Sequence, residues 1–143
     1  MKMLLRWDRE SAGRDVLDAI FPNQKARKAA EEMVRTMKGN HGSLTNSQMK
    51  EFAISLNEGI GAVKYSYRNF YAYVLKKMVD LGLVGRDVPL WSAAARRTVW
   101  GYSLRRLKIP KRPPGEEYDF WKAAWLMARS WNRLLDGGDG TAG

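Results

Sequence analysis

The chain has 143 residues, enough for one domain with a hydrophobic core and too few for two domains of ordinary size. Its hydrophobic fraction of 45% is that of a globular protein, not of a disordered one. The lack of cysteine excludes disulfide bonds and thiolate metal sites, and a formal net charge of +10 favours an anionic partner.

The N-terminal extension, residues 1–23, has no apolar run long enough for a signal peptide. No stretch of the chain reaches the roughly 20 apolar residues of a membrane span, so we expect a cytoplasmic protein. A short helix is predicted over residues 11–20. It must end near Pro22, because a residue that precedes proline is disfavoured in the helical conformation.

Two amphipathic helices and a short strand are predicted next. The first helix runs from Gln24 to Lys38, and the turn 39–42 follows it. Its apolar residues recur at helical spacing on one face: Ala26, Ala29, Ala30, Met33, Val34 and Met37. Residues 43–45 are long enough for one small strand. Thr45 and Gln48 have the spacing of a capping box, which predicts that the second helix begins there.

A third helix is predicted from Ser66, its N-cap, to Leu81, with Gly82 just beyond its end. At about 100° per residue, one face of this helix is apolar or aromatic and is expected to join the core. It carries Tyr67, Phe70, Tyr71, Val74, Met78 and Leu81. The opposite face is expected to be exposed and carries Tyr65, Ser66, Asn69, Ala72, Tyr73 and Lys76, with Arg68 and Lys77 at its flanks.

The segment after the third helix is predicted to contain two strands. Residues 83–86 have the composition of a strand, and residues 98–104 alternate with the period of one. Pro89 argues against a regular central strand in 87–98, and residues 92–97 within this segment are interpreted as a helical turn or an exposed loop.

The junction Val74-Leu-Lys-Lys-Met-Val-Asp-Leu-Gly-Leu-Val84, in which a helix passes directly into a strand, resembles the winged helix-turn-helix DNA-binding family. Tyr102-Ser-Leu104 is similar to that family's returning wing strand, and the resemblance covers about residues 24–107. It implies that the third helix enters the major groove and that the wing contacts the backbone or the minor groove. The turn before the third helix and the wing loop are both longer than in compact members.

The predicted fold is therefore mainly α with a small β-wing. The extension 1–23 precedes a winged-helix domain at 24–107, a basic Pro-rich linker at 108–115, a C-terminal helix at 116–136 and a disordered tail at 137–143.

The positive charge is confined to one third of the chain. Twelve Lys or Arg and two Asp lie between Lys64 and Arg112, while bases and acids balance elsewhere. Basic side chains release condensed counterions when they bind a phosphate polymer, so nucleic acid is the favoured partner. A solubilising surface and an anionic membrane are the alternatives. The candidate contact residues are Lys64, Tyr65, Ser66, Arg68, Asn69, Tyr73, Lys76, Lys77, Arg86, Arg96, Arg97, Arg105, Arg106, Lys108, Lys111 and Arg112.

The C-terminal helix is apolar over more than half of its circumference, which suggests that it packs on two sides. We predict a homodimer in which Trp121, Trp125, Ala128, Trp131 and Leu135 lie near the interface. In the alternative arrangement, the N-terminal segment covers the second side within a monomer. Stacking of these tryptophans on single-stranded bases is a third possibility.

No enzymatic motif is recognisable. His41, the one histidine, lies in a turn, and no cofactor, metal site or small-molecule ligand is evident. We expect a double-stranded DNA-binding protein, either a transcriptional regulator or a nucleoid-associated or replication factor. An RNA-binding or ribosome-associated protein and a protein-interaction module in a larger assembly are the alternatives.

Overall fold

The computed structural model describes residues 16–61, 63–108 and 120–137, which are mainly helical with a small three-stranded antiparallel sheet. The chain divides into two compact units. One is Asn23–Arg105, and the other comprises the described parts of 1–22 and 106–143. The predicted linker 108–115 and tail 137–143 lie largely outside the described residues.

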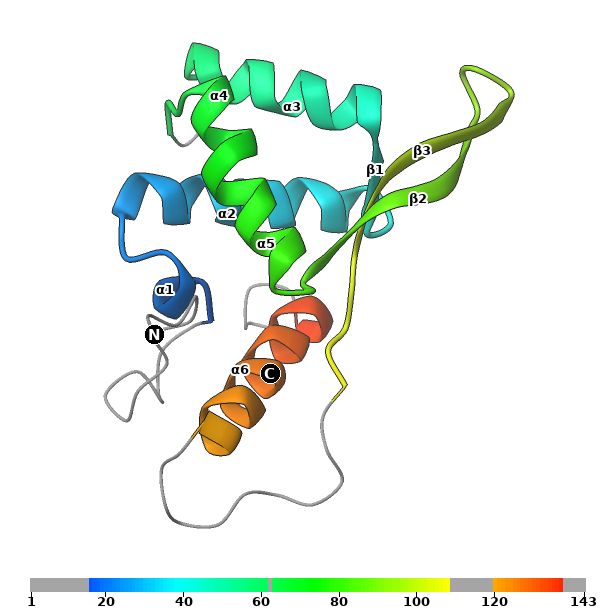
Figure 1. Ribbon diagram of the computed structural model, residues 1–143. Helices are drawn as coiled ribbons and strands as arrows, with labels where there is room; N and C mark the ends of the chain where they lie inside the picture. Colours follow the sequence, from blue (N-terminus) through cyan, green and yellow to red (C-terminus); the bar gives the residue numbers. More distant parts are fainter. Residues whose placement is uncertain (1–15, 62, 109–119, 138–143) are drawn as a thin grey trace. The chain divides into compact units, whose positions relative to one another are not determined.

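The unit Asn23–Arg105 contains three helices and the whole sheet (Figure 1). In chain order its elements are α2 (Gln24–Gly39), β1 (Ser43–Thr45), α3 (Asn46–Glu58), α4 (Tyr67–Asn69), η2 (Phe70–Leu75), α5 (Lys76–Asp80), β2 (Val84–Ser92) and β3 (Arg97–Leu104). We call the continuous run α4–η2–α5, residues 67–80, the third helix. It crosses in front of α2 in Figure 1 and packs against it through η2.

Side-chain caps define where the first two helices of this unit begin. Asn23 accepts a hydrogen bond from the N–H of Ala26 at the start of α2 (3.1 Å). Thr45 and Gln48 form the predicted capping box of α3, with bonds of 3.1 and 2.9 Å. The predicted apolar face of α2 is confirmed in full, because all six of its residues are buried. Local sequence signals therefore suffice to predict where both helices begin.

The third helix has the predicted N-cap at Ser66 but differs from a regular α-helix over residues 70–75, which form a π-helical turn. A π-turn is wider than an α-turn and rotates the residues that follow relative to a uniform wheel. Consequently Leu75, which is not among the residues predicted for the core face, is buried with Phe70, Val74 and Met78. Tyr67, predicted for the same core face, is only half-buried.

No regular central strand was predicted for 87–98, yet the segment is largely strand, and the turn or loop predicted at 92–97 corresponds to the hairpin tip. Strand β2 continues through this segment to Ser92, pairs with β3, and leaves a tip of only residues 93–96. The sheet order is β1-β3-β2, so β2 is an edge strand, and edge strands are where proline is tolerated in a sheet. A bulge between Gly85 and Val88 accommodates Asp87 at φ 56°. The resulting β2–β3 hairpin projects beyond the helices (Figure 1).

The close approach of β1 to β3 depends on Gly101. It pairs with Thr45 on one side and Val88 on the other. A Cβ atom at this position would lie 2.4 Å from the carbonyl oxygen of Leu44 and 2.4 Å from Cδ1 of Leu90. No side chain fits there without displacing the backbone of β1.

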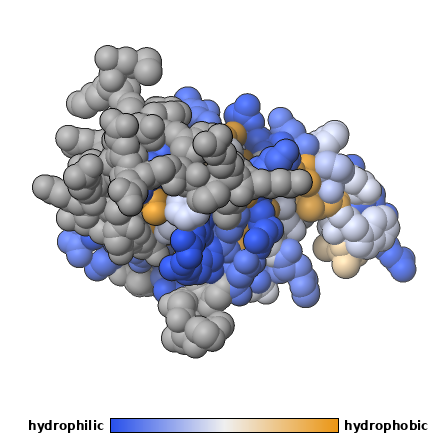
Figure 2. All heavy atoms as spheres, turned by 90° about the horizontal axis from the view of Figure 1, so that it is seen from below, coloured by the Kyte–Doolittle hydropathy of each residue, from blue (hydrophilic) through white to orange (hydrophobic). Residues whose placement is uncertain are grey.

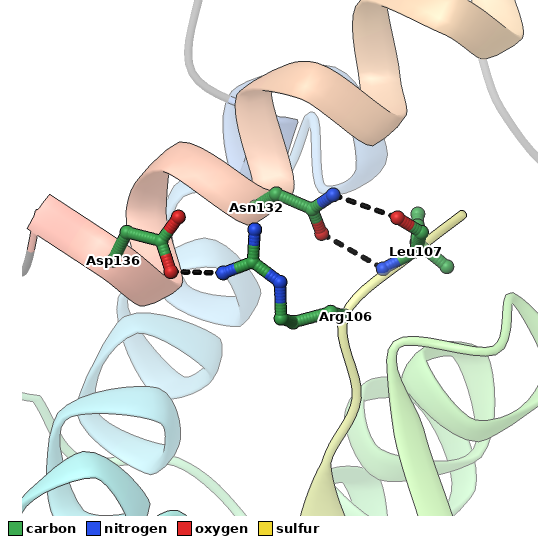
Figure 3. Close-up of polar contacts among 4 residues, drawn as sticks. All are labelled: Arg106, Leu107, Asn132 and Asp136. Atoms are coloured by element: carbon green, nitrogen blue, oxygen red, sulfur yellow. Dashed lines mark hydrogen bonds and ion pairs between the residues drawn. The ribbon is translucent and has the colours of Figure 1, made fainter. Parts of the chain in front are cut away.

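The second unit contains α1 (Val16–Ile20) and α6 (Phe120–Gly137), which contact each other. The N–H of Val16 donates to Oγ of Ser130 (3.1 Å). Asn132, which is 5% exposed, accepts from the N–H of Leu107 and donates to its carbonyl, both at 2.7 Å (Figure 3). Arg106 also forms an ion pair with Asp136 (Figure 3). One amide side chain thus satisfies both backbone groups of Leu107 and ties that segment to α6.

Replacing Asn132 by Ala is expected to lower the free energy of unfolding by about 1–3 kcal/mol, because two backbone groups of Leu107 lose their partner. Hydrogen exchange at the Leu107 amide should accelerate as well. Arg133→Ala, on the exposed side of α6, is the control and should change neither quantity appreciably. Unchanged exchange at Leu107 in Asn132→Ala would show that the amide pairing does not hold this segment.

Candidate nucleic-acid interface

The outward face of the third helix carries the polar residues predicted for it. Ser66, Arg68, Asn69, Ala72, Tyr73 and Lys76 are exposed, and Tyr73 retains 63% of its accessible surface. Lys64, just before the helix, is also exposed, whereas Tyr65 and Lys77 are half-buried. The helix therefore presents an amide, hydroxyls and cations together, which are the groups that bond base edges and phosphates.

The start of the third helix is held by the end of α3. The N–H of Tyr67 donates to Oδ1 of Asn57 (2.9 Å), and the N–H of Tyr65 donates to the carbonyl of Leu56 (3.0 Å). Oγ of Ser66 accepts from the N–H of Asn69 (3.3 Å). These bonds satisfy backbone donors that a helix start leaves unpaired, and they fix the direction in which the exposed face points.

An aromatic cluster connects the inner side of this helix with the sheet. The ring centroids of Tyr67 and Tyr71 lie 5.0 Å apart, and those of Phe70 and Tyr71 5.5 Å apart. Burial, reinforced by the nearby Tyr67 and Tyr102, raises the pKa of Tyr71 above its ordinary value, and burial also raises the pKa of Tyr102. A tyrosine hydroxyl is neutral at physiological pH even at its ordinary pKa of about 10, so these upward shifts leave both groups uncharged.

The cations of the third helix differ in how freely they can meet a phosphate. Lys76 forms an ion pair with Asp80 (2.7 Å), and burial lowers the pKa of Lys77. Arg68 is exposed and forms no ion pair with any residue that the structure describes. Arg68 is thus the helix cation best suited to a phosphate contact.

The hairpin carries the remaining candidate cations of this unit. Arg96 lies at the tip at φ 55° and Arg97 begins β3; both are exposed and have no ion pair among the described residues. Arg86 is 3.9 Å from Asp87, a loose pair in the bulge. The side chain of Arg105 lies over Gly85, where a Cβ atom would meet it at 2.1 Å. On the face shown in Figure 2, hydrophilic side chains lie beside paler and hydrophobic ones where the hairpin projects.

The last predicted contact residues do not belong to this unit. Arg106 and Lys108 are part of the unit that contains α6, and Arg106 is paired with Asp136. Lys111 and Arg112 lie outside the described residues. The candidate interface therefore consists of the residues from Lys64 to Arg105, a stretch with eight Lys or Arg and two Asp.

The residues predicted for a dimer interface differ in how exposed their side chains are. Trp131 is fully buried and Ala128 is 5% exposed, so neither side chain is available to a second copy. Trp125 and Leu135 are half-buried, with Arg129 lying 5.2 Å from the centroid of Trp125, and the side chain of Trp121 lies outside the described part. The packing of α1 on α6 corresponds to the alternative in which the N-terminal segment covers α6 within one chain.

Two residues that were not predicted belong to this surface. Trp91 and Trp100 are 68% and 59% exposed on the hairpin, an unusual position for tryptophan. The alternation of residues 98–104 included Trp100 as a strand residue, but no strand was predicted over 87–91, so its relation to Trp91 was not recognised. A signal was present in Pro89-Leu-Trp91, an apolar run on an expected surface segment.

Among the described residues there is no group of three or more His, Asp or Glu arranged to hold a metal ion. In the same part of the chain, no helix has the length and apolar character needed to cross a membrane. Comparison with known proteins yields no matching family model, no matching curated protein and no matching solved structure.

Proposed function

We propose that the unit Asn23–Arg105 is a winged helix-turn-helix module that binds double-stranded DNA. The order helix, strand, helix, helix, strand, strand is that of the family which the sequence resembles. In the proposed complex, the third helix lies in the major groove, and the β2–β3 hairpin contacts the backbone or the minor groove as the wing.

The observation that supports this proposal best is the arrangement of free cations and polar groups in a single unit. Arg68 and Asn69 on the third helix and Arg96 and Arg97 on the hairpin are all exposed. The earlier half of the unit is nearly balanced, with six Lys or Arg and four Glu between Asn23 and Val63. The positive charge is therefore concentrated on the elements that the proposal directs to DNA.

Each element would have a different task. Asn69 can bond adenine through two hydrogen bonds, and the small Ala72 permits close approach to the base edges. The arginines would fix the position of the protein on the phosphate backbone without reading the base sequence.

A role as a transcriptional regulator or as a nucleoid or replication factor is part of the same proposal, and a homodimer through α6 remains a prediction.

The experiment is a titration of the full chain with labelled duplex DNA over a series of salt concentrations. We expect log K to fall with log salt with a slope of about −3 to −6, because each neutralised phosphate contributes about −0.9. Duplex RNA and single-stranded RNA of the same sequence serve as competitors. A slope near zero, or stronger binding to RNA than to DNA, would contradict the proposal.

A further inference from the structure

The exposed tryptophans Trp91 and Trp100 share one face of the hairpin. The register pairs Trp91 with Thr98 and Pro89 with Trp100, so the two indoles are diagonal neighbours. Diagonal neighbours in an antiparallel pair lie within reach of each other when the side chains are aromatic. The two indoles, which we call the tryptophan pair, are 68% and 59% exposed.

This face continues the side of β3 that meets the third helix. Trp100 and Tyr102 are two residues apart on β3 and therefore point to the same side of the strand. Tyr67 lies close enough to Tyr102 to contribute to the raised pKa of Tyr102, and Tyr102 contributes in the same way to the raised pKa of Tyr71. Aromatic side chains thus extend from the third helix along β3 to the tryptophan pair on the hairpin.

The surroundings of the pair are cationic. Arg86 and Arg96 are exposed on the same hairpin, and the charge of Arg86 acts on the Tyr102 hydroxyl, on the tryptophan side of β3. Arg97 is also exposed, but it precedes Thr98 and so points to the opposite side of β3. Asp87 is the one acid on β2 and β3. Aromatic faces next to cations suit a nucleobase and its phosphate, since indoles stack on bases while arginines neutralise the backbone. A basic surface of this kind is a poor match for a second copy of the chain, which has the same charge.

The geometry of DNA determines whether a base has an uncovered face on which an indole can stack. Within a continuous duplex both faces of every base are covered by neighbouring bases, and exposing one costs a few kcal/mol. Bases in a single strand beside a duplex are already uncovered. We propose, resting on the proposed function, that Trp91 and Trp100 stack on unpaired bases, and that the preferred ligand is duplex DNA joined to a single-stranded segment.

The test compares a blunt duplex with the same duplex carrying a single-stranded tail of about ten nucleotides on the 3′ or the 5′ strand. Because stacking on one aromatic side chain typically changes affinity by about tenfold, we expect the tailed duplex to bind at least tenfold more tightly. Tail-dependent quenching of tryptophan fluorescence should accompany this gain. The gain should also persist as salt rises, whereas affinity for the blunt duplex falls.

The variant Trp91→Thr with Trp100→Thr keeps residues that favour strands and removes both indoles. It should bind the tailed duplex no better than the blunt one, so the ratio of the two affinities should fall from at least about ten to about one. The quenching caused by the tail should disappear. If the double variant does not fold, the single variant Trp91→Thr, at the more exposed position, is measured in its place.

The remaining outcomes distinguish a failure of this inference from a failure of the proposed function. Equal binding of tailed and blunt duplexes by the original chain overturns this inference and leaves the proposed function intact. Binding to neither refutes the proposed function and this inference with it. Concentration-dependent self-association that disappears in the double variant, or binding to anionic phospholipid vesicles that depends on the pair, would identify a different occupant and also overturn it.

Discussion

Replacing Arg96 by Asn and Arg97 by Thr is expected to weaken duplex binding on the order of 50-fold at 0.1 M salt. Each lost phosphate contact reduces the salt slope by about 0.9, so the slope should become shallower by about 2. The substitutions are chosen to preserve the hairpin. Asn tolerates the left-handed conformation of residue 96, and Thr favours the strand that begins at 97.

The matched control removes two positive charges elsewhere in the same unit. Lys25 and Lys28 are exposed on α2, and their replacement by Gln changes the net charge by the same amount. This control should reduce affinity by less than about threefold, since charges away from a contact act only through the screened field of the whole protein. Equal losses in both variants would mean that net charge, and not the hairpin, carries the interaction.

Gly101→Ala is expected to lower the free energy of unfolding by about 2–3 kcal/mol, at the upper end of what overpacking typically costs. The added methyl group would meet the Leu44 carbonyl and Leu90 at 2.4 Å, and Cα of Thr45 at 2.8 Å. Two of these three atoms are backbone atoms of β1, which cannot rotate away. The melting temperature should fall on the order of 10 °C.

Gly39→Ala provides the control for this prediction. Gly39 ends α2, and a Cβ atom there would have no atom within 4 Å. Alanine should therefore leave stability unchanged or raise it by up to about 1 kcal/mol, because glycine loses more conformational entropy on folding. A melting temperature of Gly101→Ala within about 1 °C of the original would show that β1 and β3 do not approach as closely as described.

The parts of the fold that were predictable are those with local signals. The face of α2, the capping box of α3 and the N-cap at Ser66 each depend on spacings of no more than four residues between successive members. The length of the hairpin depends on pairing across the sheet, and Pro89, which argues against a central strand, does not distinguish an edge strand from a loop. The burial of Leu75 follows from a π-turn, for which the sequence pattern has no equivalent.

The candidate site was predictable to a similar degree. The exposed face of the third helix and the arginines of the hairpin follow from periodicity and charge. The assignment of Arg106 to a different unit, and its pairing with Asp136, depend on contacts between residues 30 positions apart. Trp131 is likewise of a residue type that is common at interfaces, and only its packing in the folded chain shows that it lies in the interior.

The hydrogen bond from Val16 to Ser130 spans 114 residues and has a consequence for synthesis on the ribosome. Asn23–Arg105 is continuous in sequence and can fold as soon as it has emerged. Helix α1 is made before it, yet α6 is made after it. Synthesis proceeds at roughly 5–20 residues per second, so the apolar side of α1 lacks its partner for on the order of 5–20 s, until α6 has been made. The nascent chain therefore completes one unit while the first helix of the other is still exposed to chaperones.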